Sequence, residues 1–231
     1  GENWNHEADF TSLPAGNYEV AVQNATGCYV SYAENPVILT DPPQLNIDEV
    51  VSTDVTCNGN SDGTITINAT GGSGELLYSI DNAQSWQENG FFSELPSGSY
   101  NVWVKDENDC QVAYSDNPIE ITQPEVLIIT DVQSQDVTEY GAADGQISIT
   151  VTGGTTPYVY SIDGGTNWQS GNSFTNLDAG TYNVAVKDVN DCFTAYENNP
   201  VLINEPSLIA IEEVIAENVT GCYGNSNGSI T

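Results

Sequence analysis

The chain has 231 residues, 39% of them hydrophobic, and it carries 33 acidic side chains against only two lysines. Its formal net charge of −31 repels nucleic acid and anionic lipid, which argues against nucleic-acid binding. The hydrophobic content is too high for a disordered polyanion, and no run approaches the ~20 apolar residues of a membrane span.

One stretch of sequence occurs three times at steps of 82 residues, beginning at Leu13, Leu95 and Leu177. Other markers keep the same step: Trp4, Trp86 and Trp168; Pro36, Pro118 and Pro200. Self-similarity at a fixed period indicates a tandem array. We therefore predict the C-terminal half of a repeat at 1–42, complete repeats at 43–124 and 125–206, and the N-terminal part of a further repeat at 207–231.

The pattern within each repeat predicts β-strands throughout. Residues Ile65–Ala69 alternate apolar and polar side chains and end at a glycine pair, as a half-buried strand before a turn does. The last strand is predicted from Val112 to Ile121, and Pro118 inside it favours an edge position. About seven short strands per repeat predict an all-β fold of tandem immunoglobulin-like sandwiches, arranged as an elongated rod.

A tyrosine follows each Leu-x-x-Gly element, at Tyr18, Tyr100 and Tyr182. In β-sandwiches such a tyrosine often hydrogen-bonds back across the preceding corner, where a glycine supplies the backbone freedom. We interpret the three as tyrosine corners. The alternative, a plain buried aromatic side chain, predicts nearly the same packing.

Several motifs in fixed order resemble the SprB repeat: Cys57 to Ile65, Gly71-Gly72, Tyr78 to Asp81, Leu95 to Asp106, and Cys110. The segment Glu139–Gly145 departs from the cysteine-led opening. The family occurs in very large surface adhesins of the Bacteroidetes. The resemblance implies type IX secretion, display on the outer bacterial surface, and a role in adhesion or gliding motility.

The five cysteines indicate an oxidising, extracellular setting. Two loops at opposite ends of a sandwich carry them, roughly 26 Å apart along a strand, whereas a disulfide needs Cα atoms within about 7 Å. A head-to-tail rod would instead bring Cys57 near Cys192. By the same rule Cys110 would pair with a cysteine upstream of residue 1, and Cys222 with one beyond residue 231. Two other arrangements stay open, Cys57 with Cys110, or the sequence neighbours Cys28 with Cys57 and Cys192 with Cys222.

Two motifs invite a ligand interpretation. The Asp/Asn runs have oxygen side chains that suit calcium: Asp106, Asn108 and Asp109; Asp188, Asn190 and Asp191. A tight hairpin turn explains the same residues, and the first copy lacks carboxylates there. The segment Ser161–Trp168 resembles the Asp-box, a turn that is usually structural. No other cofactor is indicated.

Trp103 is predicted to point outward because its neighbours Val102 and Val104 point inward. It is the candidate ligand contact, either stacking on a sugar ring or packing against a neighbouring domain. The repeated polar residues include no nucleophile with a base, so no enzyme is predicted. We expect a stiff acidic stalk of a surface adhesin, touching neighbouring repeats. The alternative is a repeat that itself binds polysaccharide, host cells or a partner protein.

Overall fold

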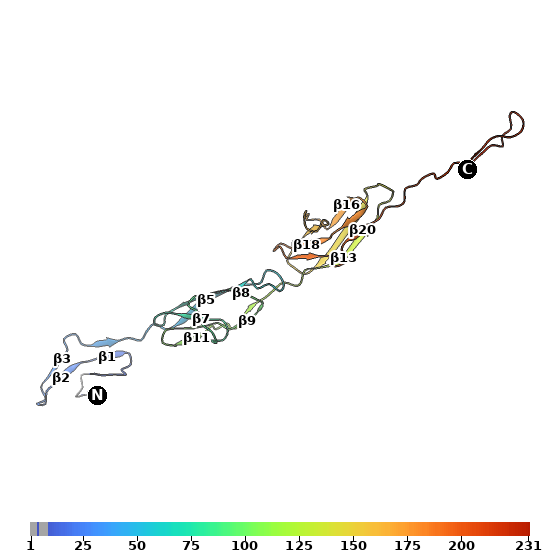
Figure 1. Ribbon diagram of the computed structural model, residues 1–231. Helices are drawn as coiled ribbons and strands as arrows, with labels where there is room; N and C mark the ends of the chain where they lie inside the picture. The colour runs from blue at the N-terminus through green and yellow to red at the C-terminus, as the bar shows by residue number, and fades with distance from the viewer. Residues whose placement is uncertain (1–3, 5–8) are drawn as a thin grey trace. The chain divides into compact units, whose positions relative to one another are not determined.

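The computed structural model describes residue 4 and residues 9–231. Residues 1–3 and 5–8, which fall in the predicted partial repeat 1–42, lie outside the described part. All regular elements among the described residues are strands, which confirms the all-β prediction (Figure 1). The chain forms two compact units: Gly1–Val55 with Ser61–Thr122, and Thr56–Asn60 with Gln123–Thr231.

The first unit contains a complete two-layered sandwich. One layer is an antiparallel sheet in the order β5-β6-β8, formed by β5 (Asn46–Thr53), β6 (Gly63–Thr70) and β8 (Phe91–Leu95). The other layer consists of two small sheets, β11-β10-β7 and β12-β9. Their strands are β7 (Leu77–Ser79), β9 (Gly98–Tyr100), β10 (Trp103–Lys105), β11 (Gln111–Ala113) and β12 (Ile119–Ile121). Ile65 and Ile67 of one layer pack with Val104 and Ile121 of the other in one buried core.

Four further strands of the first unit pair as two hairpin-like sheets, β1-β4 and β2-β3. They are β1 (Gly16–Tyr18), β2 (Ala21–Gln23), β3 (Tyr29–Ser31) and β4 (Val37–Leu39). Many of their apolar side chains are exposed, including Val22 and Val30.

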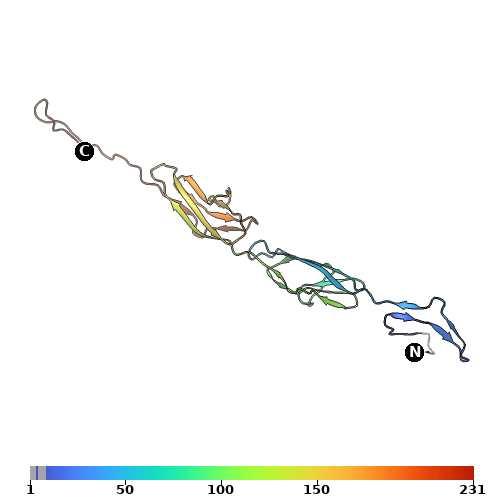
Figure 2. The same cartoon turned by 180° about the vertical axis from the view of Figure 1, so that it is seen from behind.

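The second unit repeats the same sandwich, which Figure 2 shows from behind. Its sheets are β13-β14-β16, β15-β18-β19 and β17-β20. The strands are β13 (Ile128–Gln135), β14 (Gly145–Thr152), β15 (Val159–Ser161), β16 (Ser173–Leu177), β17 (Gly180–Tyr182), β18 (Ala185–Lys187), β19 (Phe193–Ala195) and β20 (Val201–Ile203). A short pair, β21 (Ala216–Glu217) with β22 (Ser229–Ile230), follows.

The long strand β6 follows from its sequence. Its side chains alternate, so that Ile65 and Ile67 are 0% and 3% exposed while Asn68 reaches solvent. The strand ends at Gly71, whose φ of +81° lies in the left-handed region. A Cβ at Gly71 would also overlap the Gln44 carbonyl oxygen, so only glycine fits this turn.

The predicted last strand, Val112 to Ile121, is wrong in one respect. It is two strands, β11 and β12, separated by the Asn117-Pro118 peptide, which is cis. The preceding strand is divided as well, because β9 pairs with β12 whereas β10 pairs with β7 and β11. The chain therefore passes from one small sheet to the next at the same level twice, and Pro118 lies in the break rather than in an edge strand.

An asparagine side chain closes this break. The Asn117 amide accepts the Val102 N–H at 2.8 Å and donates to the Val102 carbonyl at 2.8 Å. Asn199 makes the same two bonds to Val184, and Asn35 makes them to Val20. The amide thus replaces a neighbouring strand for one residue. The sequence analysis noted only the prolines that follow these asparagines.

Removing one of these amides should destabilise the fold. Val184 is 0% exposed, so Asn199→Ala would leave its N–H and C=O buried without partners. We expect a loss of about 3 kcal/mol in the free energy of unfolding, measured by urea denaturation of the oxidised chain. The matched control is Asn198→Ala, at the exposed residue next to it, for which about 0.5 kcal/mol or less is expected. Equal losses in the two variants would contradict the bracketing role of Asn199.

Candidate functional site

The three predicted corner tyrosines make the same hydrogen bond. Tyr18, Tyr100 and Tyr182 each donate from the phenol to the carbonyl four residues earlier, at 2.6, 2.8 and 2.8 Å. The bond ties the end of β1, β9 or β17 to the turn before it. Burial raises the pKa of Tyr100 and Tyr182, so these phenols stay protonated donors. Their role is to fix the corner.

The acidic loop after β10 is organised by one carboxylate. Asp106 is 2% exposed, and its Oδ1 accepts the N–H groups of Asn108 and Cys110, both at 2.9 Å. Its Oδ2 accepts the N–H of Ser73 at 3.0 Å, which joins two loops. Burial alone would raise the pKa of Asp106, but these N–H donors hold it below its ordinary value.

The third copy of this loop has the same arrangement, and the first copy has part of it. Asp188 accepts the N–H groups of Asn190 and Cys192 on one oxygen and that of Thr155 on the other. In the first copy Asn24, an amide, accepts the N–H groups of Thr26 and Cys28. A side-chain oxygen, charged or neutral, is therefore what the turn requires at this position.

These bonds favour the turn interpretation of the Asp/Asn runs over the calcium interpretation. Asp109 and Asp191 form ion pairs with Lys105 and Lys187, at 2.8 and 2.7 Å. Asn108 and Asn190 enter the turn through their backbone N–H groups. Within the described residues, no group of three or more His, Cys, Asp or Glu side chains is placed to hold a metal ion.

The Asp-box segments form closed turns. In the first sandwich the Asp81 carboxylate accepts the hydroxyls of Ser85 and Ser79 at 2.6 and 2.8 Å and the backbone N–H groups of Gln84 and Ser85. Asp163 does the same with Ser161 and Asn167 in the second sandwich.

A lysine covers the tryptophan that ends each Asp-box segment. The Lys105 ammonium lies 5.1 Å from the centroid of the Trp86 ring, and Lys187 lies 5.2 Å from that of Trp168. Both lysines of the chain are thus engaged with the sandwich itself.

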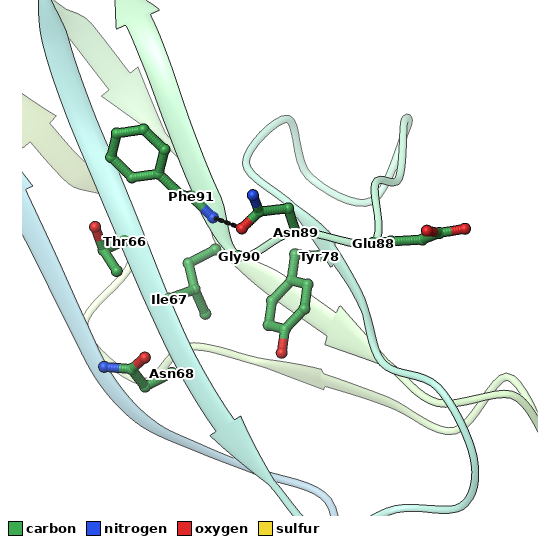
Figure 3. A pocket seen from close by; sticks show the side chains of 8 residues that line it. All are labelled: Thr66, Ile67, Asn68, Tyr78, Glu88, Asn89, Gly90 and Phe91. Carbon is green, nitrogen blue, oxygen red and sulfur yellow. Dashed lines mark hydrogen bonds between the residues drawn. The ribbon is translucent and has the colours of Figure 1, made fainter.

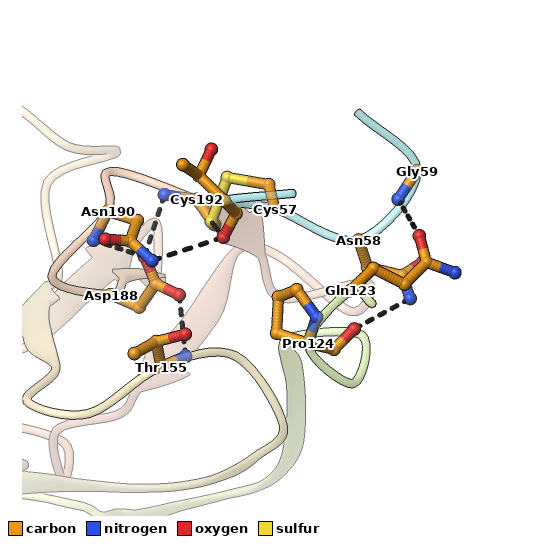
Figure 4. The surroundings of a disulfide bond; sticks show 10 residues. Cys57, Asn58, Gly59, Gln123, Pro124, Thr155, Asp188, Asn190 and Cys192 are labelled. Atoms are coloured by element: carbon orange, nitrogen blue, oxygen red, sulfur yellow. Dashed lines mark hydrogen bonds between the residues drawn. A yellow bond between two sulfur atoms is a disulfide. The ribbon is translucent and has the colours of Figure 1, made fainter. Parts of the chain in front are cut away.

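Cys57 and Cys192 form a disulfide within the second unit, with Cα atoms 5.6 Å apart (Figure 4). This is the pairing that a head-to-tail order of repeats predicts. Cys28, Cys110 and Cys222 are free thiols. The alternatives, Cys57 with Cys110 and the two sequence-neighbour pairs, are therefore wrong. The bond is reached from opposite ends of the sequence, with 135 residues of separation.

Hydrogen bonds surround the disulfide. The Asn190 side chain donates to the Thr56 carbonyl at 3.2 Å, and Asn58 donates to the Pro124 carbonyl at 2.9 Å (Figure 4). The Gly59 N–H donates to the Gln123 side chain at 2.8 Å. Residues Thr56–Asn60 are thus held by the disulfide and by side-chain bonds as well. Asn190, a candidate calcium ligand from the sequence, serves here as a donor.

Trp103 lies in β10 on the opposite face from the buried Val104, as the alternation predicts. It is half-buried, and its indole N–H donates to the Asn82 side chain at 3.3 Å. The hydrogen bond ties the ring to the Asp-box turn of its own sandwich. Ala185, at the equivalent place, is 1% exposed. Packing against a neighbouring loop therefore accounts for most of what Trp103 contacts.

The turn carboxylates give the fold a testable pH dependence. The Ser85 hydroxyl, opposed by partial burial and helped by the other donors, lowers the pKa of Asp81 from 3.8 to about 2. A lowered pKa means that the contribution of Asp81 to stability is full above pH 3.8 and is lost as the pH falls through about 2. The stabilities of wild type and Asp81→Asn should therefore converge between pH 4 and pH 2, measured by urea denaturation. Asp116→Asn, which removes an exposed carboxylate outside these turns, should show no such convergence, and a midpoint near 4 in an NMR titration of Asp81 would contradict the assignment.

Residues of the described part form no helix that is both long enough and apolar enough to cross a membrane. Among solved structures, one match is the C-terminal 282-residue fragment of intimin in complex with the intimin-binding domain of the translocated intimin receptor. Its TM-score is 0.36 and its sequence identity 16%, with 71% of this chain and 64% of that chain covered. The present chain thus spans less than two thirds of that structure. No curated protein matches.

The SprB repeat family matches the chain at two places, residues 50–85 and 132–167. One match begins in β5 of the first sandwich and the other in β13 of the second, at the same point of the repeated fold. Both matches include the Asp-box turn and its serine. The chain therefore belongs to the SprB repeat family.

Proposed function

We propose that this chain is part of the extracellular stalk of a very large bacterial surface adhesin that serves adhesion or gliding motility and reaches the surface by type IX secretion. SprB repeats belong to cell-surface adhesins. The observation that carries the stalk role is the use made of the repeated polar side chains. Tyr100, Asn117, Asp106 and Asp81, with their counterparts 82 residues later, all hydrogen-bond to their own sandwich. The period therefore preserves a scaffold rather than a reaction centre.

The electrostatics support the same proposal. A net charge of −31 keeps neighbouring stalks apart and soluble, while both lysines are paired within their own sandwiches. The surface carries nothing that would attract nucleic acid or an anionic membrane. Catalysis forms no part of the proposal, because the repeated polar groups are already committed to turns and corners.

The disulfide gives the stalk a defined path for tension. When the chain is pulled from its ends, force enters at β5, crosses from Cys57 to Cys192 through the sulfur atoms, and leaves through β19. Everything between the two cysteines, from β6 to β18, is then shielded from extension. A covalent shortcut of this kind suits a stalk that is repeatedly stretched.

Single-molecule force spectroscopy tests this path. Pulled from its ends, the oxidised chain should release roughly 450 Å less contour length than the reduced chain, because 135 residues at about 3.4 Å each stay inside the closed loop. A Cys57→Ser variant should give the longer length with or without reductant. Equal lengths for the oxidised and reduced wild-type chain would sink the proposal that the disulfide bears the tension.

The alternative function is a repeat that binds carbohydrate or protein through its own surface. The observation that favours it is Trp103, a half-buried indole that the second sandwich replaces with Ala185.

The stalk proposal expects Trp103→Ala to leave attachment of the chain to polysaccharides and cell surfaces unchanged, with or without calcium. Attachment measured by surface plasmon resonance, with Phe193→Ala as an exposed aromatic control, decides between the two. Saturable attachment that is lost only with Trp103→Ala would make the repeat itself the adhesive surface.

A further inference from the structure

The two sandwiches diverge in sequence at one turn. Between the Asp-box tryptophan and the following strand, Glu88-Asn89-Gly90-Phe91 of the first sandwich corresponds to Ser170-Gly171-Asn172-Ser173 of the second. The backbone of the turn is held in the same way in both. Gln87 donates from its side chain to the carbonyls of Asn89 and Phe91, and Gln169 to those of Gly171 and Ser173. Only the side chains presented by the turn differ.

In the second sandwich an amide fills the space beside this turn. The Asn172 side chain donates to the Ile149 carbonyl at 2.9 Å, next to the backbone bond from the Ile149 N–H to the Asn172 carbonyl at 2.9 Å. Tyr160, which lies beneath, is only 8% exposed. The turn is closed against the long strand β14.

In the first sandwich Gly90 occupies that position, and the space is open. Gly90 has no side chain to offer, so the Ile67 carbonyl lacks the amide partner that Ile149 has. A Cβ at Gly90 would overlap this carbonyl oxygen and would come within 3.2 Å of the Tyr78 ring. A groove of about 470 Å³ results, with Ile67 and Tyr78 beside Gly90 (Figure 3). Tyr78 is half-buried where its counterpart Tyr160 is buried.

The groove offers hydrogen-bond acceptors and aromatic rings. The acceptors are the Ile67 carbonyl, the Glu88 carboxylate and the Asn68 side-chain oxygen, whose amide nitrogen already donates to Glu49. Tyr78 and Phe91, the latter 48% exposed, supply the rings. The occupant must therefore be a donor, and the charge of the chain favours a cation over an anion.

The second sandwich indicates the shape of that donor. There the group against the equivalent carbonyl is a planar –NH₂, the Asn172 amide. A guanidinium presents the same planar N–H edge, adds a positive charge for Glu88, and stacks on aromatic faces. We propose that the groove at Gly90 binds an arginine side chain of a basic partner polypeptide. The site lies on one sandwich only, and it does not depend on the stalk role.

The test is an NMR titration of the oxidised full chain with Nα-acetyl-arginine amide. Saturable shifts are expected at the backbone amides of Ile67, Gly90 and Phe91. Transplanting the closed turn with Glu88→Ser, Asn89→Gly, Gly90→Asn and Phe91→Ser should weaken binding by at least about tenfold. The reciprocal transplant, Ser170→Glu, Gly171→Asn, Asn172→Gly and Ser173→Phe, should create saturable shifts at Ile149.

Two controls keep the outcome decisive. Glu88→Gln retains the shape of the groove and removes only the charge, so it should weaken arginine binding several-fold while leaving thermal unfolding unchanged. Nα-acetyl-lysine amide should bind more weakly than arginine because it lacks the planar edge. Shifts spread evenly over the acidic surface without saturation would overturn the proposal. So would saturation by a methyl hexoside in place of arginine, which would identify a sugar site.

Discussion

Each sandwich depends on satisfying the backbone of one strand that changes sheets at its midpoint. The chain leaves β9, which pairs with β12, and enters β10, which pairs with β7 and β11. At the crossing Val102 is fully buried yet has no strand beside it, and the Asn117 amide supplies both missing bonds. Tyr100 fixes the approach and Asp106 fixes the exit. An unsatisfied buried peptide group costs about 1–3 kcal/mol, so a few side chains decide whether the crossing forms.

This constraint explains which parts of the fold the sequence could predict. Alternation in Ile65–Ala69 and the 82-residue period reflect burial and repetition, which are visible in one dimension. The role of Asn117 was not predictable in that way, because it depends on a partner 15 residues away that only the crossing brings close. The asparagine before each repeated proline, at Asn35, Asn117 and Asn199, was the available signal. The disulfide stayed one of three arrangements because the choice rests on how loops meet in space.

The Asp/Asn loops show how a charged motif can be misread as a metal site. Asp106 and Asp188 carry the residue types that calcium prefers, but their oxygens are occupied by backbone N–H groups. The first copy made the distinction possible, since Asn24 keeps the same two bonds without a charge. A position that tolerates either an amide or a carboxylate is defined by a hydrogen-bond acceptor, whereas a divalent cation would select for charge.

The same division between backbone and side chain bears on how these repeats could acquire partners. Gln87 and Gln169 hold their turns through main-chain carbonyls, so the turn keeps its form whichever side chains it carries. Residues 88–91 are therefore free to vary without cost to the sandwich, and the change from Asn172 to Gly90 is enough to open a groove. In a tandem array, a scaffold of this kind can present a different surface on each repeat while every repeat keeps the same corners, crossing and turns. The adhesive or docking capacity of such a chain then lies in single repeats, and the stalk between them needs only to fold.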